Sequence, residues 1–272
     1  MALPIPAPDR TALVTGASSG IGLELARCLA ARGHGVTLVA RREDRLRELA
    51  DELSATGVRA EVIAADLTDI VSRNRVVEQV AERGLSVDVL VNNAGFSTMG
   101  PVHAGDAERE VAMVRTDVEA VVHLCTAFVP GMVERRSGAV LNVASTAAFQ
   151  PLPGQAGYGA SKAFVLSYTQ ALGAELKGTG VTATTLCPGP VETGFAEAAG
   201  LGDEEAGDAL PRIMWVPAAR VARAAVEGLA AGRSVVIPGV ANRALARVSH
   251  HAPRALVLPV LAKQHPSLKS RS

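Results

Sequence analysis

The chain has 272 residues, enough for one large α/β domain or two small ones, and 48% of them are apolar. Its 27 basic and 27 acidic residues cancel, and only one Trp, two Tyr and five Phe are present, so neither phosphate attraction nor base stacking favours a nucleic-acid partner. The three cysteines are far apart and form no CxxC pair, which argues against a disulfide framework or a zinc site, predicts no metal, and fits a cytoplasmic protein.

The N-terminal stretch has no basic segment followed by an apolar run, so we expect no signal peptide, and no uncharged apolar run of about 18 residues predicts a membrane-spanning helix. Beyond it, strand-like and helix-like segments alternate. Short apolar runs predict strands at 11–16, 35–40, 59–69, 87–95, 138–145, 181–189 and 234–239. The stretches between them predict helices at 17–33, 42–57, 70–84, 106–135, 157–178 and 217–232.

Most of these strands are continuous apolar runs, as expected when both faces of a sheet are covered. The pattern predicts an α/β fold: a three-layer, doubly wound parallel sheet of the Rossmann type, with about seven strands and helices on both faces. No internal linker is evident, so we expect a single domain over 1–272. Residues 190–215 are irregular and predict a substrate lid, and residues 240–272 form a basic, apolar C-terminal tail.

The glycine-rich stretch Thr15–Gly22, "TGASSGIG", follows the first strand and opens the first helix. Phosphates bind well at such a place because free backbone N–H groups and the helix dipole both point outward. Gly16 permits the tight turn, Gly20 lets the backbone approach a pyrophosphate, and Gly22 allows close packing of the helix on the sheet. The alternative is a flexible turn. Cofactor-binding candidates in this stretch are Gly16, Ser18, Ser19, Gly20, Ile21 and Gly22.

The choice between two dinucleotides is expected at the end of the second strand, where an acid would bind the ribose of NAD and an arginine the 2′-phosphate of NADP. The chain has Ala40 in place of the acid, followed by Arg41 and Arg42. Guanidinium groups pair with phosphate through charge-assisted contacts. We therefore predict that NADP(H) is preferred over NAD(H), with a solvated helix start as the alternative for the two arginines.

Three further patterns follow: "NNAG" at Asn92–Gly95, Ser145 at the end of the fifth strand, and Tyr158 with Lys162 at the start of the next helix. Together with "TGASSGIG" and "PGPVET", in this order, they make the chain resemble the classical short-chain dehydrogenase/reductase family over roughly residues 10–240. Alone, Tyr158 and Lys162 would more simply be a helix-surface pair.

The resemblance implies catalytic roles. Tyr158 would be the acid/base that gives a proton to the substrate carbonyl oxygen, and Ser145 would orient that oxygen. Lys162 lies one helical turn after Tyr158, so we expect its charge to lower the phenol pKa from about 10, and in the family this lysine also holds the nicotinamide ribose. Gly159, Ala160 and Ser161, between the two, are small enough to leave room for cofactor and for a neighbouring helix.

The resemblance also implies further cofactor contacts. On the adenine side these are Asp66, Leu67, Asn93, Ala94 and Gly95, and Asn93 would also brace the sheet. On the nicotinamide side they are Tyr158 and Lys162, and in the loop that holds the nicotinamide they are Pro188, Gly189, Val191 and Thr193. Asp66 has an alternative role as a cap of the next helix.

One departure from the family pattern is Asp117, which stands where the family usually has a relay asparagine. A carboxylate has the shape of the amide but lacks its N–H₂ donor. Asp117 is therefore a candidate that either keeps the relay or raises a local pKa. Its alternative is a polar helix residue that meets Arg115 or a neighbouring chain.

The region after "PG" suggests an apolar substrate, although these side chains are equally candidates for the core. They are Phe96, Met99, Phe149, Leu152, Phe195, Leu210, Ile213, Met214 and Trp215. The basic tail either covers the cleft or a neighbouring subunit, or contacts an anionic membrane surface, which we consider less favoured. The long helices at 106–135 and 157–178 imply, by the same resemblance, a homodimer or homotetramer.

These patterns predict an NADP(H)-dependent oxidoreductase that interconverts a carbonyl and a secondary alcohol on an apolar small molecule. The alternative is a non-catalytic NADP(H)-binding regulatory protein of the same fold. An epimerase or dehydratase of the extended relatives is disfavoured, because those usually have a G-x-x-G-x-x-G turn and a longer substrate domain.

Overall fold

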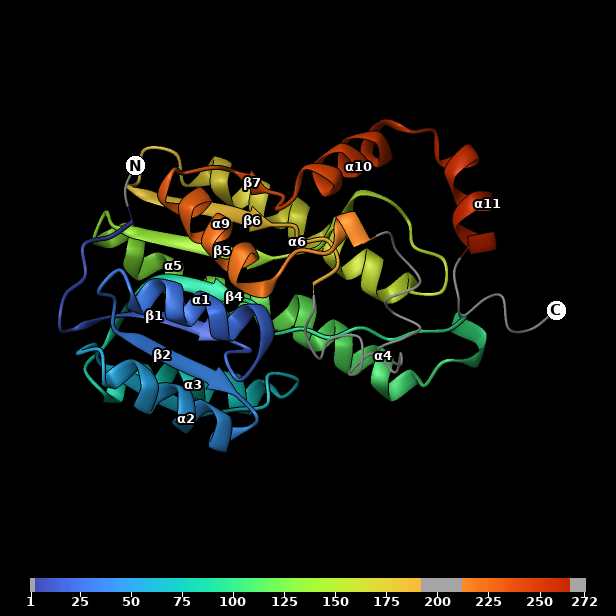
Figure 1. Ribbon diagram of the computed structural model, residues 1–272. Coiled ribbons are helices and arrows are strands. Elements are labelled where there is room, and N and C mark those ends of the chain that lie inside the picture. The colour runs from blue at the N-terminus through green and yellow to red at the C-terminus, as the bar shows by residue number, and fades with distance from the viewer. Residues whose placement is uncertain (1–2, 192–211, 265–272) are drawn as a thin grey trace.

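The computed structural model describes residues 3–191 and 212–264 (Figure 1). Seven parallel strands form one sheet in the order β3-β2-β1-β4-β5-β6-β7. The order reverses between β1 and β4, and ligands of such sheets bind beyond the carboxyl ends of the strands at this point. The strands are β1 (Arg10–Thr15), β2 (Val36–Ala40), β3 (Ala60–Ala64), β4 (Ser86–Asn92), β5 (Gly138–Val143), β6 (Val181–Leu186) and β7 (Val235–Val236).

Helices cover both faces of the sheet, which confirms the predicted fold class (Figure 1). On one face pack α1 (Gly20–Ala30), α2 (Glu43–Ser54) and α9 (Ala218–Ala230). On the other pack α3 (Ile70–Glu82), α5 (Ala120–Glu134) and α6 (Ala156–Glu175).

The core consists of two apolar clusters, one on each side of the sheet. Successive side chains of a strand point to opposite faces. Thus Leu38 and Leu141 lie in the cluster under α1, α2 and α9, whereas their neighbours Val39 and Val140 lie in the cluster under α3, α5 and α6. All residues of β2 and β5 are buried, which explains why these strands are mostly apolar along their whole length.

The helix predicted at 106–135 forms as one helical stretch with an irregular middle. It consists of α4 (Ala107–Val114), a π-helical turn η2 (Arg115–Glu119) and α5. Contrary to our expectation, Ala107–Glu134 is long and apolar enough to span a membrane by length and composition alone. Because the buried side chains of α5 pack in the apolar cluster on one face of the sheet, we interpret the stretch as a core helix.

The segment after β7 is the first part of the basic, apolar tail. It forms α10 (Val240–His251) and α11 (Arg254–Gln264), which with α4 lie beyond the carboxyl ends of the strands (Figure 1). Short 3₁₀ turns are η1 (Val102–Ala104), η3 (Thr146–Phe149) and η4 (Arg212–Met214). Most of the expected lid, 190–215, and the end of the tail lie outside the described residues, so the division into domain, lid and tail stays a prediction.

Candidate active site

The glycine turn has the backbone that its sequence predicts. Gly16 (φ +66°) and Gly20 (φ +57°) are in the left-handed region, which L side chains rarely adopt. A methyl group on Gly22 would collide with the carbonyl oxygen of Gly16, so helix and turn approach as closely as only glycine allows.

The turn is held to the sheet by two residues at strand ends. Thr15 Oγ1 accepts hydrogen bonds from the backbone N–H groups of Asn93 (2.9 Å) and Ala94 (3.0 Å). Asn93 Nδ2 donates to the carbonyl oxygen of Thr15 at 2.9 Å. The predicted bracing by Asn93 is therefore present: it joins β1 to β4 at the point where the strand order reverses.

The N-terminus of α1 receives no side-chain cap. Ser19 occupies the cap position, but its side chain makes no capping hydrogen bond to the helix. Instead, Arg42 Nη2 donates to Ser19 Oγ (2.8 Å) and to Ser18 Oγ (3.1 Å). A guanidinium thus lies over a helix N-terminus whose first N–H groups no side chain occupies, which suits a phosphate.

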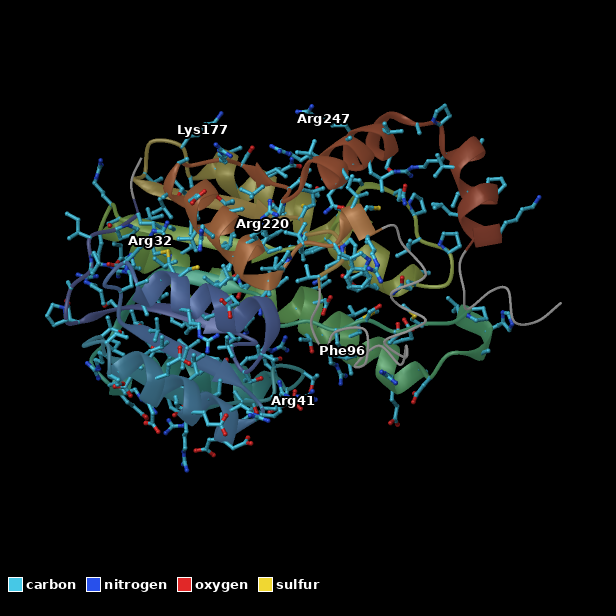
Figure 2. The ribbon with its side chains drawn as sticks, viewed as in Figure 1. Arg32, Arg41, Phe96, Lys177, Arg220 and Arg247 are labelled. Atoms are coloured by element: carbon cyan, nitrogen blue, oxygen red, sulfur yellow. The ribbon has the colours of Figure 1, made fainter. Side chains whose placement is uncertain are left out.

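The neighbouring Arg41 is exposed, and it makes no side-chain hydrogen bond or ion pair with any described residue. Arg41 follows the carboxyl end of β2, and Phe96 lies at the same end of the parallel strands (Figure 2). Ala40, where a ribose-binding acid was sought, is 8% exposed.

At the end of β3, Asp66 does not cap the next helix. Its Oδ1 accepts from the N–H and the hydroxyl of Thr68, both at 2.9 Å, and so shapes the loop. The helix cap is Asp69, which accepts from the N–H of Ser72 at 2.8 Å. Leu67, its partner in the sequence prediction, is buried at 5% exposure.

The structure places Ser145, Tyr158 and Lys162 close together. Ser145 follows β5 and caps η3, accepting from the N–H of Ala147 at 3.1 Å. Tyr158 lies in the first turn of α6, and its hydroxyl is hydrogen-bonded to the Ser145 side chain. Lys162 Nζ lies 5.6 Å from the centre of the Tyr158 ring. The small residues between them also have a packing role, since a methyl on Gly159 would lie 3.1 Å from Leu152 Cβ.

The direction of the Tyr158 pKa corrects the prediction from sequence. Burial raises the pKa of the phenol, because the tyrosinate loses its hydration. The charge of Lys162 and the hydrogen bond to Ser145 act in the expected direction, but they do not outweigh burial. Burial alone would lower the pKa of Lys162, yet the Asp117 carboxylate and Tyr158 raise it, so this lysine stays charged.

Asp117 contributes most to the raised pKa of Lys162. Its side chain is fully buried, and Oδ2 forms an ion pair with Lys162 Nζ at 2.9 Å. Oδ1 accepts from the N–H of Phe96 at 3.1 Å. Asp117 therefore faces the candidate site; the alternative contact with Arg115 is not among its interactions within the described chain.

Of the nicotinamide-loop candidates, Pro188, Gly189 and Val191 are described, whereas Thr193 lies outside the described residues. The carbonyl of Pro188 accepts from the N–H of Thr146 at 2.9 Å. Gly189 packs directly on Asn242 of α10, leaving no room for a side chain. Asn242 is fully buried and donates to the carbonyls of Met214 (2.9 Å) and Pro238 (3.1 Å).

A buried polar network that the sequence reasoning missed lies beneath the site. Asn92 Nδ2 donates to Asn142 Oδ1 at 2.9 Å, and Asn142 Nδ2 donates to Thr169 Oγ1 at 2.9 Å. Thr169 in turn donates to the carbonyl of Val165 at 2.6 Å. These hydrogen bonds connect β4 and β5 to α6, the helix that carries Tyr158. The only sequence signal was an asparagine inside each of two apolar strands.

The substrate-facing candidates are only partly described. Ile213 is 79% exposed and Met214 is buried, while the remaining described candidates are half-buried. The half-buried residues are Phe96, Met99, Phe149, Leu152 and Trp215. Phe195 and Leu210 lie outside the described residues.

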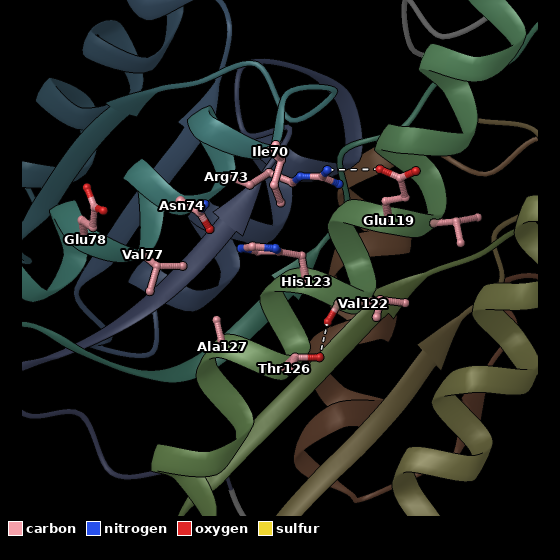
Figure 3. Close-up of a pocket in the computed structure, with 11 residues that line it drawn as sticks. Ile70, Arg73, Asn74, Val77, Glu78, Glu119, Val122, His123, Thr126 and Ala127 are labelled. Atoms are coloured by element: carbon pink, nitrogen blue, oxygen red, sulfur yellow. Dashed lines mark hydrogen bonds and ion pairs between the residues drawn. The ribbon is translucent and has the colours of Figure 1, made fainter.

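A separate groove of about 740 Å³ lies between α3 and α5 (Figure 3). Arg73 of α3 is 4% exposed in its side chain and pairs with Glu119 Oε2 at 3.1 Å. His123 points from α5 toward α3 across this groove (Figure 3). None of the candidate catalytic residues lines it.

Comparisons with known proteins agree with this geometry. The sequence model of a family described as short chain dehydrogenase matches residues 10–203. A short chain dehydrogenase of Pseudocercospora fijiensis is 40% identical over 68% of this chain, which spans 60% of that relative's length. Sulfoacetaldehyde reductase 2 of Chromohalobacter salexigens is 40% identical over 74% of this chain and 80% of its own. The solved structure of a short-chain dehydrogenase from Sphingobium yanoikuyae in complex with NADPH is 32% identical and covers 94% of both chains with a TM-score of 0.78.

Proposed function

Because the chain belongs to the short-chain dehydrogenase family, we propose that it is an NADP(H)-dependent oxidoreductase that interconverts a carbonyl compound and a secondary alcohol. The observation that carries the proposal is the hydrogen bond between the Tyr158 hydroxyl and the Ser145 side chain, one helical turn from a charged Lys162. This group lies at the edge of the sheet where the glycine turn and the strand-order reversal also lie.

The described residues fit a dinucleotide. The glycine turn brings backbone N–H groups to the surface at the start of α1, and Arg42 lies over them. Arg41 is free to contact the 2′-phosphate that distinguishes NADP from NAD. The NADPH complex of the relative from Sphingobium yanoikuyae supports this choice. When bound, the cofactor supplies the hydride that reduces the carbonyl carbon.

The protein's own residues hold the substrate oxygen and move one proton. In the reductive direction, Ser145 donates a hydrogen bond that fixes the carbonyl oxygen. Tyr158 then gives its hydroxyl proton to that oxygen: the phenol O–H bond breaks, the alcohol O–H bond forms, and a tyrosinate remains. Lys162 stabilises that anion through its charge. The raised pKa of Tyr158 keeps the phenol protonated, which favours this direction.

We propose an apolar substrate because the described side chains near the site are mostly aromatic or aliphatic: Phe96, Met99, Phe149, Leu152 and Trp215. One relative is a sulfoacetaldehyde reductase, so the family accommodates polar aldehydes as well. A panel of apolar ketones and small polar aldehydes, scored by NADPH consumption, tests both statements. Turnover of apolar ketones supports the proposal; no turnover of any carbonyl compound, with NADPH bound, would favour a regulatory protein instead.

We further propose a homo-oligomer that uses the outer faces of α4 and α6. These helices expose Val111 (49%), Val114 (38%) and Phe164 (41%), and the Phe164 ring stacks on Tyr168 at 5.8 Å. Exposed apolar side chains gathered on long helices are typical of subunit contacts. Light scattering after gel filtration measures the state directly, and a monomer at micromolar concentration would contradict it.

A further inference from the structure

The buried ion pair between Asp117 and Lys162 is enclosed by neighbouring segments of the candidate site. Lys162 Nζ lies 2.9 Å from Asp117 Oδ2 and donates to the carbonyl of Val143 at 3.2 Å. The carbonyl of Val143 thus accepts one of the three N–H donors of the ammonium, and Asp117 Oδ2 lies beside the ammonium as its ion-pair partner. A methyl group on Gly95 would lie 2.8 Å from Asp117 Oδ1 and 3.1 Å from Lys162 Nζ, so the loop after β4 closes directly over the pair.

The contacts of Asp117 favour its ionised form. Both atoms that approach its oxygens are donors: the backbone N–H of Phe96 at Oδ1 and the ammonium of Lys162 at Oδ2. A neutral carboxyl group would have to donate its proton toward one of them. Burial raises the pKa of Asp117, while Lys162 and the Phe96 N–H oppose that rise.

The π-helical turn explains how a carboxylate reaches this position. Asp117 is the middle residue of η2 (Arg115–Glu119), which joins α4 to α5. Such turns widen a helix locally and are frequent at functional sites. Phe96 lies in the loop after β4, and Lys162 projects from α6, so three segments far apart in sequence meet at one carboxylate.

The charge of Asp117 acts on Tyr158 through the shared lysine. The groups that act on the pKa of Tyr158 are Lys162 on the same helix, Ser145 after β5, Asp117 in the π turn and Cys187 after β6. Cys187 is a buried thiol whose pKa is raised to about 12, so it is neutral over the working range. Lys162 and Asp117 are therefore the only full charges among these groups, and together they sum to zero.

We propose that Asp117 is a positioning residue that neutralises Lys162, so that Tyr158 keeps its proton to higher pH and the enzyme is biased toward carbonyl reduction. The inference rests on the proposed function for its catalytic meaning. An uncharged amide at this position would leave the lysine's charge uncompensated. The tyrosinate would then form more readily, and alcohol oxidation, which needs the tyrosinate as base, would gain.

The test titrates the phenol without turnover. The chain has two tyrosines, so Tyr168→Phe leaves Tyr158 as the only one, and its ionisation is followed by ultraviolet difference absorbance of the cofactor-free protein. In this background we expect Asp117→Asn to move the midpoint of tyrosinate formation to lower pH. Circular dichroism at each pH verifies the fold. If the Asn variant does not fold, Asp117→Ser removes the same charge and must give the same direction.

Asp88→Asn is the matched control. Asp88 is also a buried carboxylate paired with a cation, Arg135 at 3.1 Å, but it lies near the amino end of β4, at the opposite edge of the sheet. We expect it to leave the Tyr158 midpoint unchanged. An equal midpoint in the Asp117→Asn protein and its parent would overturn the inference, as would an equal shift from Asp88→Asn.

Kinetics give the second readout. In Asp117→Asn, the alkaline midpoint of the kcat profile for reduction and the acidic midpoint for oxidation should both move down by about one pH unit. KM for the carbonyl should change less than kcat. Because the phenol titration needs no substrate, failure of the proposed reductase function would show as absent turnover in the parent, whereas failure of this inference would show as an unmoved titration.

Discussion

Arg41→Ala separates the contact with the 2′-phosphate from the rest of cofactor binding. Arg41 has no side-chain partner among the described residues, so its loss breaks no contact within that part of the chain. A charge-assisted bond at an exposed site contributes about 1 to 1.5 kcal/mol, which corresponds to about a tenfold change in Kd. We expect NADPH to bind about tenfold more weakly and NADH to bind within about twofold of the parent.

Arg42→Ala should behave differently, because Arg42 also holds Ser18 and Ser19 of the glycine turn. Its loss should weaken both cofactors. Arg45→Ala is the matched control, since Arg45 is an exposed arginine of α2 that pairs with Glu48 at 3.0 Å. Calorimetric Kd values for NADPH and NADH at two salt concentrations measure all three variants. Equal weakening of the two cofactors by Arg41→Ala, or no weakening of either, would refute the reasoning.

Three further outcomes test the hydrogen bonds beneath the site, the packing of Gly95 against it, and a buried histidine elsewhere in the fold. Asn142→Ala removes the two buried hydrogen bonds that Asn142 makes with Asn92 and Thr169, so the free energy of unfolding in urea should fall by about 3 kcal/mol; a change as small as that of the exposed Thr126→Ala would contradict this. Gly95→Ala should displace the Asp117–Lys162 pair and reduce kcat about 100-fold with the fold intact, unlike Gly105→Ala, which has room; equal activities would count against it. Burial lowers the pKa of His34 from 6.5, so the unfolded chain binds the proton first as the pH falls. The urea midpoint should therefore drop between about pH 7 and pH 5, and this drop should shrink in His34→Gln; an unchanged drop would refute the assignment.

The features of the site that lie close together in sequence were predictable. The Thr15–Gly22 turn follows a strand and opens a helix, so its spacing alone indicated the backbone that the structure has. Tyr158 and Lys162 share a face because four residues make one helical turn. The parallel sheet followed from apolar runs that alternate with amphipathic stretches, since only a sheet covered on both sides buries such strands completely.

Features that join distant residues were not predictable. The partner of Asp117 is 45 positions away and depends on a π turn, which leaves no mark on a helical periodicity. The Asn92–Asn142 bond requires the pairing of β4 with β5, in which these two residues are direct neighbours. The net direction of the Tyr158 pKa depends on burial, and burial follows from packing rather than from the neighbouring lysine.

The helix cap and the tail show how local signals mislead. Asp66 and Asp69 both precede α3, and only the backbone geometry decides that Asp69 caps it. The tail contains Pro253 and Pro259, and proline usually interrupts a helix. In the structure Pro253 lies between α10 and α11, where a proline is well tolerated, and Pro259 lies inside α11.

The central claim is that Tyr158 delivers the proton in carbonyl reduction. Its most direct test compares Tyr158→Phe with Tyr168→Phe, the same change at the other tyrosine, in NADPH-dependent turnover of a ketone that the parent reduces. The account predicts that Tyr158→Phe binds NADPH with parental affinity and loses turnover by a factor of about 100 or more, while Tyr168→Phe retains it. Parental turnover in folded, NADPH-bound Tyr158→Phe would contradict it.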